Sequence, residues 1–134
     1  MGLDKINTAL AKYAKYSDLP LRIVIGMVFI TAGAGKLFGG IDGFTGMLAG
    51  LGFGVTAGLF AWLVALIEFV GGIAILAGWQ TRIFALLLAI IMVVAIVMVK
   101  LPTGFAAATS DIVLLGVSLT LAFAGSKSLC VDKQ

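Results

Sequence analysis

Long uncharged stretches separate the few charged residues of this chain, and their spacing predicts the fold. Uncharged runs extend from Arg22 to Lys36, from Glu68 to Arg82 and from Arg82 to Lys100. A helix needs about 20 predominantly apolar residues to cross the hydrocarbon core of a bilayer. The pattern therefore predicts an all-α fold, a bundle of four transmembrane helices. The expected spans are residues 20–38, 56–78, 83–100 and 105–125, within a membrane domain of residues 19–126 and before a tail of residues 127–134.

Two segments fit this pattern less directly. The uncharged segment 112–124 is short, so the fourth helix is expected to begin near Phe105 and to take Asp111 inside the membrane. Pro102 ends the preceding helix, because proline cannot continue one. The glycine-rich stretch 43–54 is expected to be an interfacial turn or a short helix.

The N-terminal segment, residues 1–18, is a separate element. Apolar residues recur at helical spacing and lysines fall on the opposite side, a pattern typical of a basic amphipathic helix on a membrane surface. The apolar positions are Leu3, Ile6, Leu10 and Tyr13, and the basic ones are Lys5, Lys12 and Lys15. A cleavable signal peptide with its cleavage site near residues 31–34 is the alternative interpretation.

Composition supports the membrane assignment and limits the chemistry. Hydrophobic residues make up 62% of the chain, charged residues 11%, and the mean hydropathy is +1.22. Soluble domains have about 45–50% apolar and about 25% charged residues. With no histidine and one cysteine, the chain alone is expected to hold no metal site, disulfide or other cofactor. The nine basic residues form no dense run, which argues against nucleic-acid binding.

The distribution of basic residues predicts the orientation. With four spans, seven basic residues lie on the side of the two termini and two, Lys36 and Lys100, lie on the other. The seven are Lys5, Lys12, Lys15, Arg22, Arg82, Lys127 and Lys133. The positive-inside rule then places both termini in the cytoplasm of a prokaryotic-type plasma (inner) membrane. Arg22 and Arg82 are expected to anchor the bundle at cytoplasmic lipid headgroups, and Cys130 to be a free thiol.

Helical rise places four charged residues at similar depth. Lys36 lies 14 residues from Arg22, as Glu68 does from Arg82, which corresponds to about 21 Å along a helix. Asp111 and Lys100 fall at about 24 and 27 Å by the same measure. A lone charge within a bilayer costs about 3 kcal/mol or more, so Lys36 is expected to pair with Glu68.

These four residues, Lys36, Glu68, Lys100 and Asp111, are the candidates for binding a ligand or relaying protons. The alternative is that Lys36, Lys100 and Asp111 mark the outer interface and extend to headgroups. Glu68 would then be a structural lock between helices.

Several short motifs occur in an order that resembles one family of membrane proteins. They are Leu21-Arg22 and Gly26, Ala32-Gly33, Gly35-Lys36-Leu37, Gly43-Phe44, Glu68-Phe69-Val70-Gly71-Gly72, Thr81-Arg82 and Leu129-Cys130-Val131-Asp132. Together they resemble the DoxX family of small four-helix membrane proteins, over about residues 19–132. The resemblance implies a membrane subunit associated with quinone-linked or thiol/sulfur redox systems. The sequence departs from the family at Lys100 and Asp111, where relatives often carry histidine and glutamate.

Three functions fit these observations. The first is a redox-associated subunit whose polar layer holds a quinone head or a small anionic substrate, with Phe29, Trp62 and Phe69 nearby. The second is a proton-coupled transporter of small molecules, and the third is a non-catalytic scaffold of a membrane complex. A stand-alone enzyme is not expected. The expected partners are the lipid bilayer, membrane or peripheral redox subunits and further copies of this chain.

Overall fold

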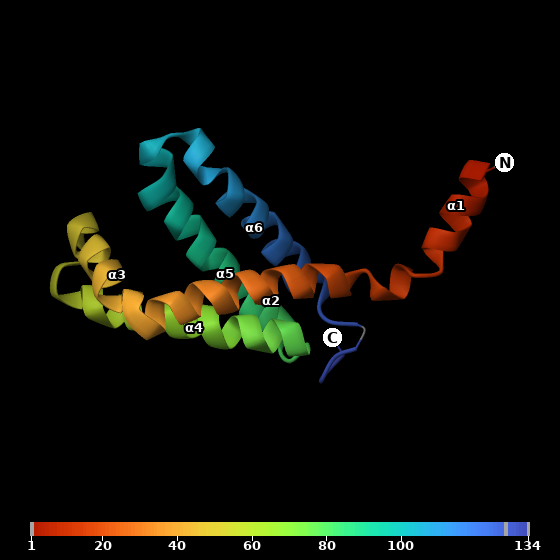
Figure 1. The fold of residues 1–134 in the computed structure, drawn as a ribbon, viewed down its shortest axis with the longest axis horizontal. Coiled ribbons are helices and arrows are strands. Elements are labelled where there is room, and N and C mark those ends of the chain that lie inside the picture. The colour runs from red at the N-terminus through yellow and green to blue at the C-terminus, as the bar shows by residue number, and fades with distance from the viewer. Residues whose placement is uncertain (1, 128, 134) are drawn as a thin grey trace.

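The computed structural model describes residues 2–127 and 129–133, and every regular element in that part of the chain is helical (Figure 1). The expected all-α bundle is confirmed. The α-helices are α1 (Gly2–Ala11), α2 (Asp18–Gly35), α3 (Ile41–Leu48), α4 (Ala57–Ala77), α5 (Thr81–Ala95) and α6 (Phe105–Ala124). After α5 the chain stays helical through Ile96–Lys100 and Leu101–Thr103, first in a wider and then in a tighter turn.

Three continuous helical stretches of the described chain are long and apolar enough to cross a membrane. They are Ala14–Ala77, Thr81–Thr103 and Phe105–Ala124. The first is not one straight helix, because Phe38, Gly39 and Gly52 have non-helical backbone angles. The chain turns back there, so that α2 and α4 pack side by side with α3 between them in sequence. The bundle thus has four long helices, the number that the charge spacing predicted.

Glycines allow α2 and α4 to approach closely. A Cβ atom at position 33 would lie 2.5 Å from the backbone nitrogen of Phe69, and one at position 72 would lie 2.7 Å from that of Ile30. Lipid tails are as apolar as the helix surfaces, so helices in a bilayer associate mainly through such close packing. The pair α2 and α4 is therefore the most tightly joined part of the bundle.

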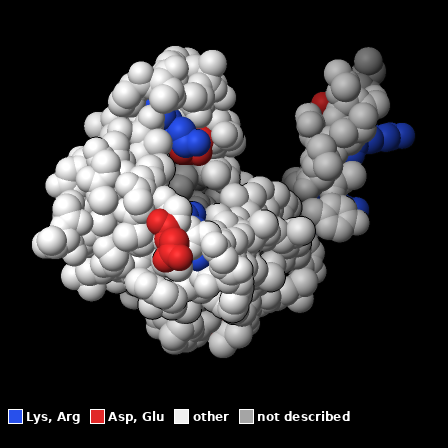
Figure 2. Space-filling view, turned by 60° about the vertical axis from the view of Figure 1, so that its left-hand side comes forward, with Lys and Arg blue, Asp and Glu red and all other residues white. Residues whose placement is uncertain are grey.

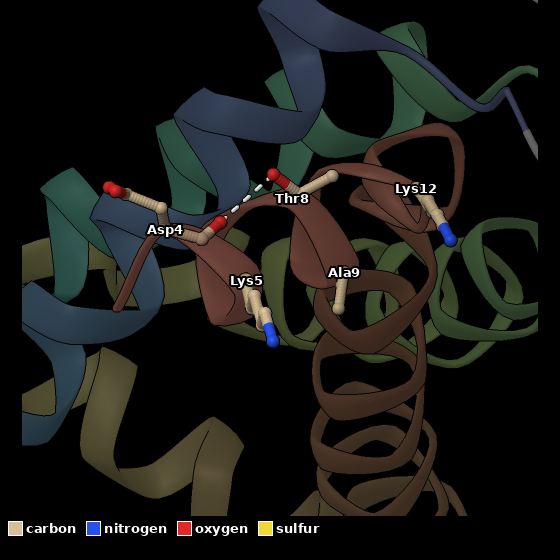
Figure 3. A pocket seen from close by; sticks show the side chains of 5 residues that line it. All are labelled: Asp4, Lys5, Thr8, Ala9 and Lys12. Carbon is tan, nitrogen blue, oxygen red and sulfur yellow. Dashed lines mark hydrogen bonds between the residues drawn. The ribbon is translucent and has the colours of Figure 1, made fainter. Parts of the chain in front are cut away.

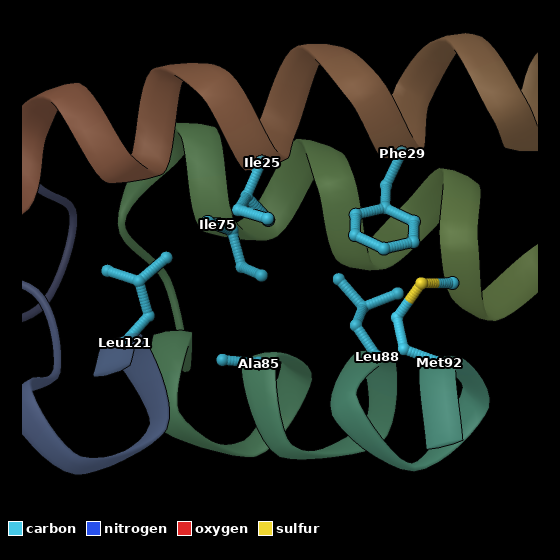
Figure 4. Packing of buried hydrophobic residues seen from close by; sticks show 7 residues of the cluster. All are labelled: Ile25, Phe29, Ile75, Ala85, Leu88, Met92 and Leu121. Carbon is cyan, nitrogen blue, oxygen red and sulfur yellow. The ribbon is translucent and has the colours of Figure 1, made fainter. Parts of the chain in front are cut away.

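The second hairpin, α5 and α6, packs against this pair at one end only. The buried core that joins the two hairpins lies at the end of the bundle where α2 begins and α4 ends, which we call the tail end (Figure 4). Its members are Ile25, Phe29, Ile75, Ala85, Leu88, Met92 and Leu121. Toward the opposite end, which carries α3, the second hairpin diverges from the first (Figure 1).

Helix α1 projects away from the bundle and has no buried residue (Figure 1). Its apolar Leu3, Ile6 and Leu10 are all exposed. Figure 3 shows its polar side, where Lys5 and Lys12 flank Ala9 over a shallow surface hollow. The amphipathic helix that the sequence predicted is present, and its contact with the membrane surface stays a prediction.

Replacing Gly72 with alanine tests the close approach of α2 and α4. The added methyl group would press on the backbone of Ile30, and overpacking of this kind destabilises by about 1–3 kcal/mol. We expect Gly72→Ala to lower the melting temperature of the detergent-solubilised protein, followed by circular dichroism. Gly58→Ala is the matched control, because nothing lies within 4 Å of a Cβ added at this position of the same helix. Equal melting temperatures for the two variants would contradict the packing argument.

Candidate functional site

A cavity of about 690 Å³ lies between the two hairpins. Its wall is mostly apolar and includes Phe29 from α2, Val64 from α4 and Ile91 from α5. All four residues that the sequence singled out also line it, namely Lys36, Glu68, Lys100 and Asp111. The space-filling view shows acidic and basic side chains beside a hollow in the bundle, whose visible face is otherwise uncharged (Figure 2). The structure thus brings the four candidates together around one space.

Lys36 and Glu68 form the ion pair that their depths predicted. Lys36 Nζ lies 3.0 Å from Glu68 Oε2 and 3.2 Å from Oε1, so the ammonium donates to both carboxylate oxygens. The Glu68 side chain is only 4% exposed, whereas that of Lys36 is 24% exposed. The Lys36 ammonium also lies 5.1 Å from the centre of the Phe44 ring, within range of a cation–π interaction.

Local backbone geometry sets the position of Lys36. Helix α2 ends at Gly35, and the chain reverses direction at Phe38 and Gly39. Gly39 has φ of 143°, a conformation that a residue with a side chain rarely adopts. Lys36 therefore stays at the end of α2 beside α4, two residues before the chain turns toward α3 at Phe38.

Lys100 and Asp111 lie on the opposite hairpin, and both are partly buried. Asp111 is inside α6, as expected from the sequence. In the part of the chain that the structure describes, the ion pairs are Lys36–Glu68 and Arg22–Asp18, so Lys100 and Asp111 are not paired with each other. The role of all four residues in binding or proton transfer stays a prediction.

Helix α3 contributes a wall of the cavity that the sequence analysis missed. Phe44, Met47 and Leu48 of α3, with Leu51 and Phe53 after it, line the space. The spacing of the first four positions, 44, 47, 48 and 51, is that of one helix face, a signal that the abundance of glycine obscured. α3 thus lines the end of the cavity farthest from the tail end with apolar side chains.

Of the three aromatic residues expected near the four charged candidates, only one lines the cavity. Phe29 lines the cavity, but Trp62 does not and is exposed on the outer surface of α4. Phe69 also lies outside the lining and stacks edge-on with Phe38, with ring centres 6.1 Å apart. The expectation was wrong for these two residues because they fall on other faces of α4 than Glu68.

Arg22 is not a headgroup anchor, so that expectation was wrong. The residue is fully buried, and its Nη1 lies 3.0 Å from Asp18 Oδ2. Its Nε donates to the carbonyl of Ile75, and its Nη2 donates to the carbonyls of Leu76 and Leu129, each at 3.0 Å. The last carbonyls of a helix lack partners within that helix and carry partial negative charge. Arg22 satisfies these carbonyls at the end of α4 and so turns inward.

The C-terminal tail joins Arg22, Asp18 and the end of α4 in one cluster of hydrogen bonds, which we call the tail cluster. The backbone nitrogens of Val131 and Asp132 donate to the carbonyls of Ala77 and Gly78, at 3.0 and 3.1 Å. The Asp132 carboxylate accepts from the backbone nitrogen of Gln80 at the start of α5. The tail therefore joins α2, the end of α4 and the start of α5.

The other two residues noted at this end of the bundle are less enclosed. Arg82 is exposed, as an anchor would be, and also donates to the carbonyl of Ala124 at 3.4 Å. Cys130 is a partly buried free thiol. Within the described residues no group of three or more histidine, cysteine, aspartate or glutamate side chains could hold a metal ion.

Long apolar helices around a cavity with two cations and two carboxylates define a small helical membrane protein with an internal polar site. The chain belongs to the DoxX family, whose sequence profile matches residues 17–101. This range includes Lys36, Glu68 and Lys100 and ends before Asp111. The chain is also similar to a Bacillus subtilis (strain 168) protein named "Putative oxidoreductase CatD", with 35% identity over 122 residues that cover 90% of this chain and 88% of the relative. No solved structure matches the chain.

A double-mutant cycle measures the ion pair in the cavity. Lys36→Met leaves the buried Glu68 without its partner, whereas the double variant Lys36→Met/Glu68→Gln removes both charges. We expect the two changes to be non-additive in the free energy of unfolding, with a coupling of about 0.5–3 kcal/mol. The control cycle combines Lys12→Met with Asp42→Asn, two exposed residues of which the first directly follows α1 and the second lies in α3. Additive effects in the Lys36–Glu68 cycle would show that the pair contributes no coupling.

The conservative variant Arg22→Lys tests the tail cluster. Lysine keeps the charge but lacks the planar fork that reaches several carbonyls at once. We expect a loss of about 1–3 kcal/mol in unfolding free energy and faster tryptic cleavage after Lys127. The matched change Arg82→Lys, at an exposed position, should stay within about 0.5 kcal/mol. Unchanged proteolysis in Arg22→Lys would contradict the assigned role.

Proposed function

We propose that this protein is a membrane subunit of a redox system and that its cavity holds the head group of a quinone or a small anionic substrate. One observation carries the proposal: the Lys36–Glu68 ion pair sits in the wall of an otherwise mostly apolar cavity. Its volume of about 690 Å³ falls within the range of small-molecule sites, about 300–1,000 Å³. Similarity to a relative named as an oxidoreductase supports the redox assignment.

The chemistry of the pair suits such a ligand. The Lys36 ammonium can donate a hydrogen bond to a carbonyl oxygen and favour negative charge on it. Glu68 holds that ammonium and can accept or return a proton on the same side of the ligand. With no histidine and one cysteine, the chain is proposed to receive electrons through a mobile carrier or a partner subunit.

The proposed setting is a prokaryotic-type plasma membrane with the tail end in the cytoplasm. This orientation rests on the excess of basic residues at that end under the positive-inside rule. The proposed partners are redox subunits in or on the membrane, and further copies of this chain are candidate partners too.

Co-purification of quinone tests the proposal. Protein purified from a quinone-containing bacterial membrane should carry quinone, measured in its lipid extract by mass spectrometry. We expect Lys36→Met to reduce the bound quinone about tenfold, the effect of losing one hydrogen bond to a charged group. Lys12→Met, at an exposed position directly after α1, should retain it.

Co-purification combined with an uptake assay distinguishes the other two functions, and either result would overturn the quinone proposal. Protein without quinone whose substrate uptake is abolished by Glu68→Gln, at unchanged expression, would identify a proton-coupled transporter. Full function of both Lys36→Met and Glu68→Gln would identify a scaffold instead.

A further inference from the structure

Part of the cavity wall is also outer surface of the bundle. Ile90 and Val94 of α5 line the cavity and are 53% and 46% exposed. Phe60 of α4 lines it as well and is also exposed. A side chain that borders an internal space and is exposed at the same time marks the rim of an opening. The rim is apolar, in contrast to the charged positions deeper inside.

One opening lies between α4 and α5, and Val28 of α2 and Met47 of α3 are exposed lining residues elsewhere on the cavity wall. Phe60 and Val64 are four residues apart on α4, and Ile90 and Val94 are four apart on α5, so each pair lies on one side of its helix. We call these four residues the lateral mouth.

The lateral mouth is closed toward the tail end and faces lipid. A Cβ atom at position 71 of α4 would lie 3.4 Å from Phe84 and 3.7 Å from Leu88 of α5, so the two helices touch there. Since both helices belong to membrane-spanning stretches, the mouth opens to the bilayer rather than to water.

The end of the cavity at α3 is lined by apolar side chains. Leu48 of α3 is buried there, Phe44 is partly buried, and Met47 is 40% exposed. A water-soluble anion that entered past these apolar side chains or through the lipid-facing mouth would lose its hydration without compensation. A molecule already dissolved in the bilayer meets no such penalty at the mouth.

We infer that the ligand is a quinone with an apolar tail, which enters from the bilayer between α4 and α5. Its head reaches Lys36, which Glu68 holds in place, and its tail lies in the lateral mouth between Phe60 and Val94. This inference rests on the proposed function and narrows it, because it excludes a tail-free quinone and a small anion as the natural ligand.

A pair of adjacent valines allows a matched test in the full-length protein, reconstituted in lipid nanodiscs. Val94 lines the cavity, whereas its neighbour Val93 does not, and the two are 46% and 45% exposed. Val94→Trp should fill the mouth, whereas Val93→Trp should add the same bulk on the lipid side. The probes are a quinone with a ten-carbon tail, the same ring without a tail, and a ten-carbon fatty acid.

The inference predicts that the tailed quinone binds at least about tenfold more tightly than the tail-free one. Val94→Trp should remove this preference, and Val93→Trp should keep it. Equal binding of the two quinones, with no effect of Val94→Trp, would overturn lateral entry and leave the proposed function standing. Binding of neither quinone would overturn the assignment of a quinone to the cavity in the proposed function. If only the fatty acid bound, and its binding depended on Val94, the lateral mouth would admit other lipids. That result would contradict the quinone assignment.

A second measurement uses the unmodified protein, so it stays informative if Val94→Trp fails to fold. A tailed quinone that carries a photoreactive diazirine at the end of its tail should label α4 and α5 at the lateral mouth. Peptide mapping should find the adducts at positions 60, 64, 90 and 94. Labelling confined to α3, or spread evenly over the outer surface, would overturn the inference.

Discussion

The bilayer supplies no partner for a polar group, and this constraint organises the whole structure. A backbone carbonyl or a charged side chain inside the hydrocarbon region must find its partner within the protein. The bundle meets this requirement at two levels. At the tail end, Arg22 satisfies the carbonyls of Ile75 and Leu76 and pairs with Asp18. Further along, Lys36 satisfies Glu68.

Helix packing differs between these two levels. Near the tail end the hairpins share a buried apolar core, and the C-terminal tail ties α2, α4 and α5 together. At the level of Glu68 α2 and α4 stay closely packed against each other, because Gly33 and Gly72 permit backbone contact. The second hairpin has diverged there, and the space between the hairpins is the cavity. A rigid end and an open end are therefore built from the same four helices.

The sequence predicted the fold well because membrane helices are limited by length and charge. Uncharged runs located the helices, and helical rise placed Lys36, Glu68, Lys100 and Asp111 at one depth. The depth of a residue along its helix can be calculated without knowing which helix faces contact one another. It was therefore enough to place these four residues around one cavity, although Lys100 and Asp111 do not pair with each other.

The errors have a common physical cause, since they concern the direction in which a side chain points around its helix. Arg22 stands at a helix start, where a lysine or arginine usually extends to headgroups. Only the three-dimensional structure shows the carbonyls of α4 and of Leu129 beside it. Trp62 and Phe69 lie close to Glu68 in sequence but on other faces of α4. The role of α3 also depended on the reversals at Gly39 and Gly52, which fold it back over the cavity.

The unequal exposure of the ion pair decides which member a ligand can reach. Glu68 is nearly enclosed, while Lys36 keeps about a quarter of its side chain exposed. An ammonium has three donor hydrogens, and two of them serve the Glu68 carboxylate. The third is left for a ligand oxygen, with the Phe44 ring beside the ammonium. In this geometry Glu68 acts first as the group that holds Lys36 in place. Under the proposed function, a proton exchanged with Glu68 would alter the charge that the ligand meets at Lys36. Binding and proton transfer would then be coupled without direct contact between Glu68 and the ligand.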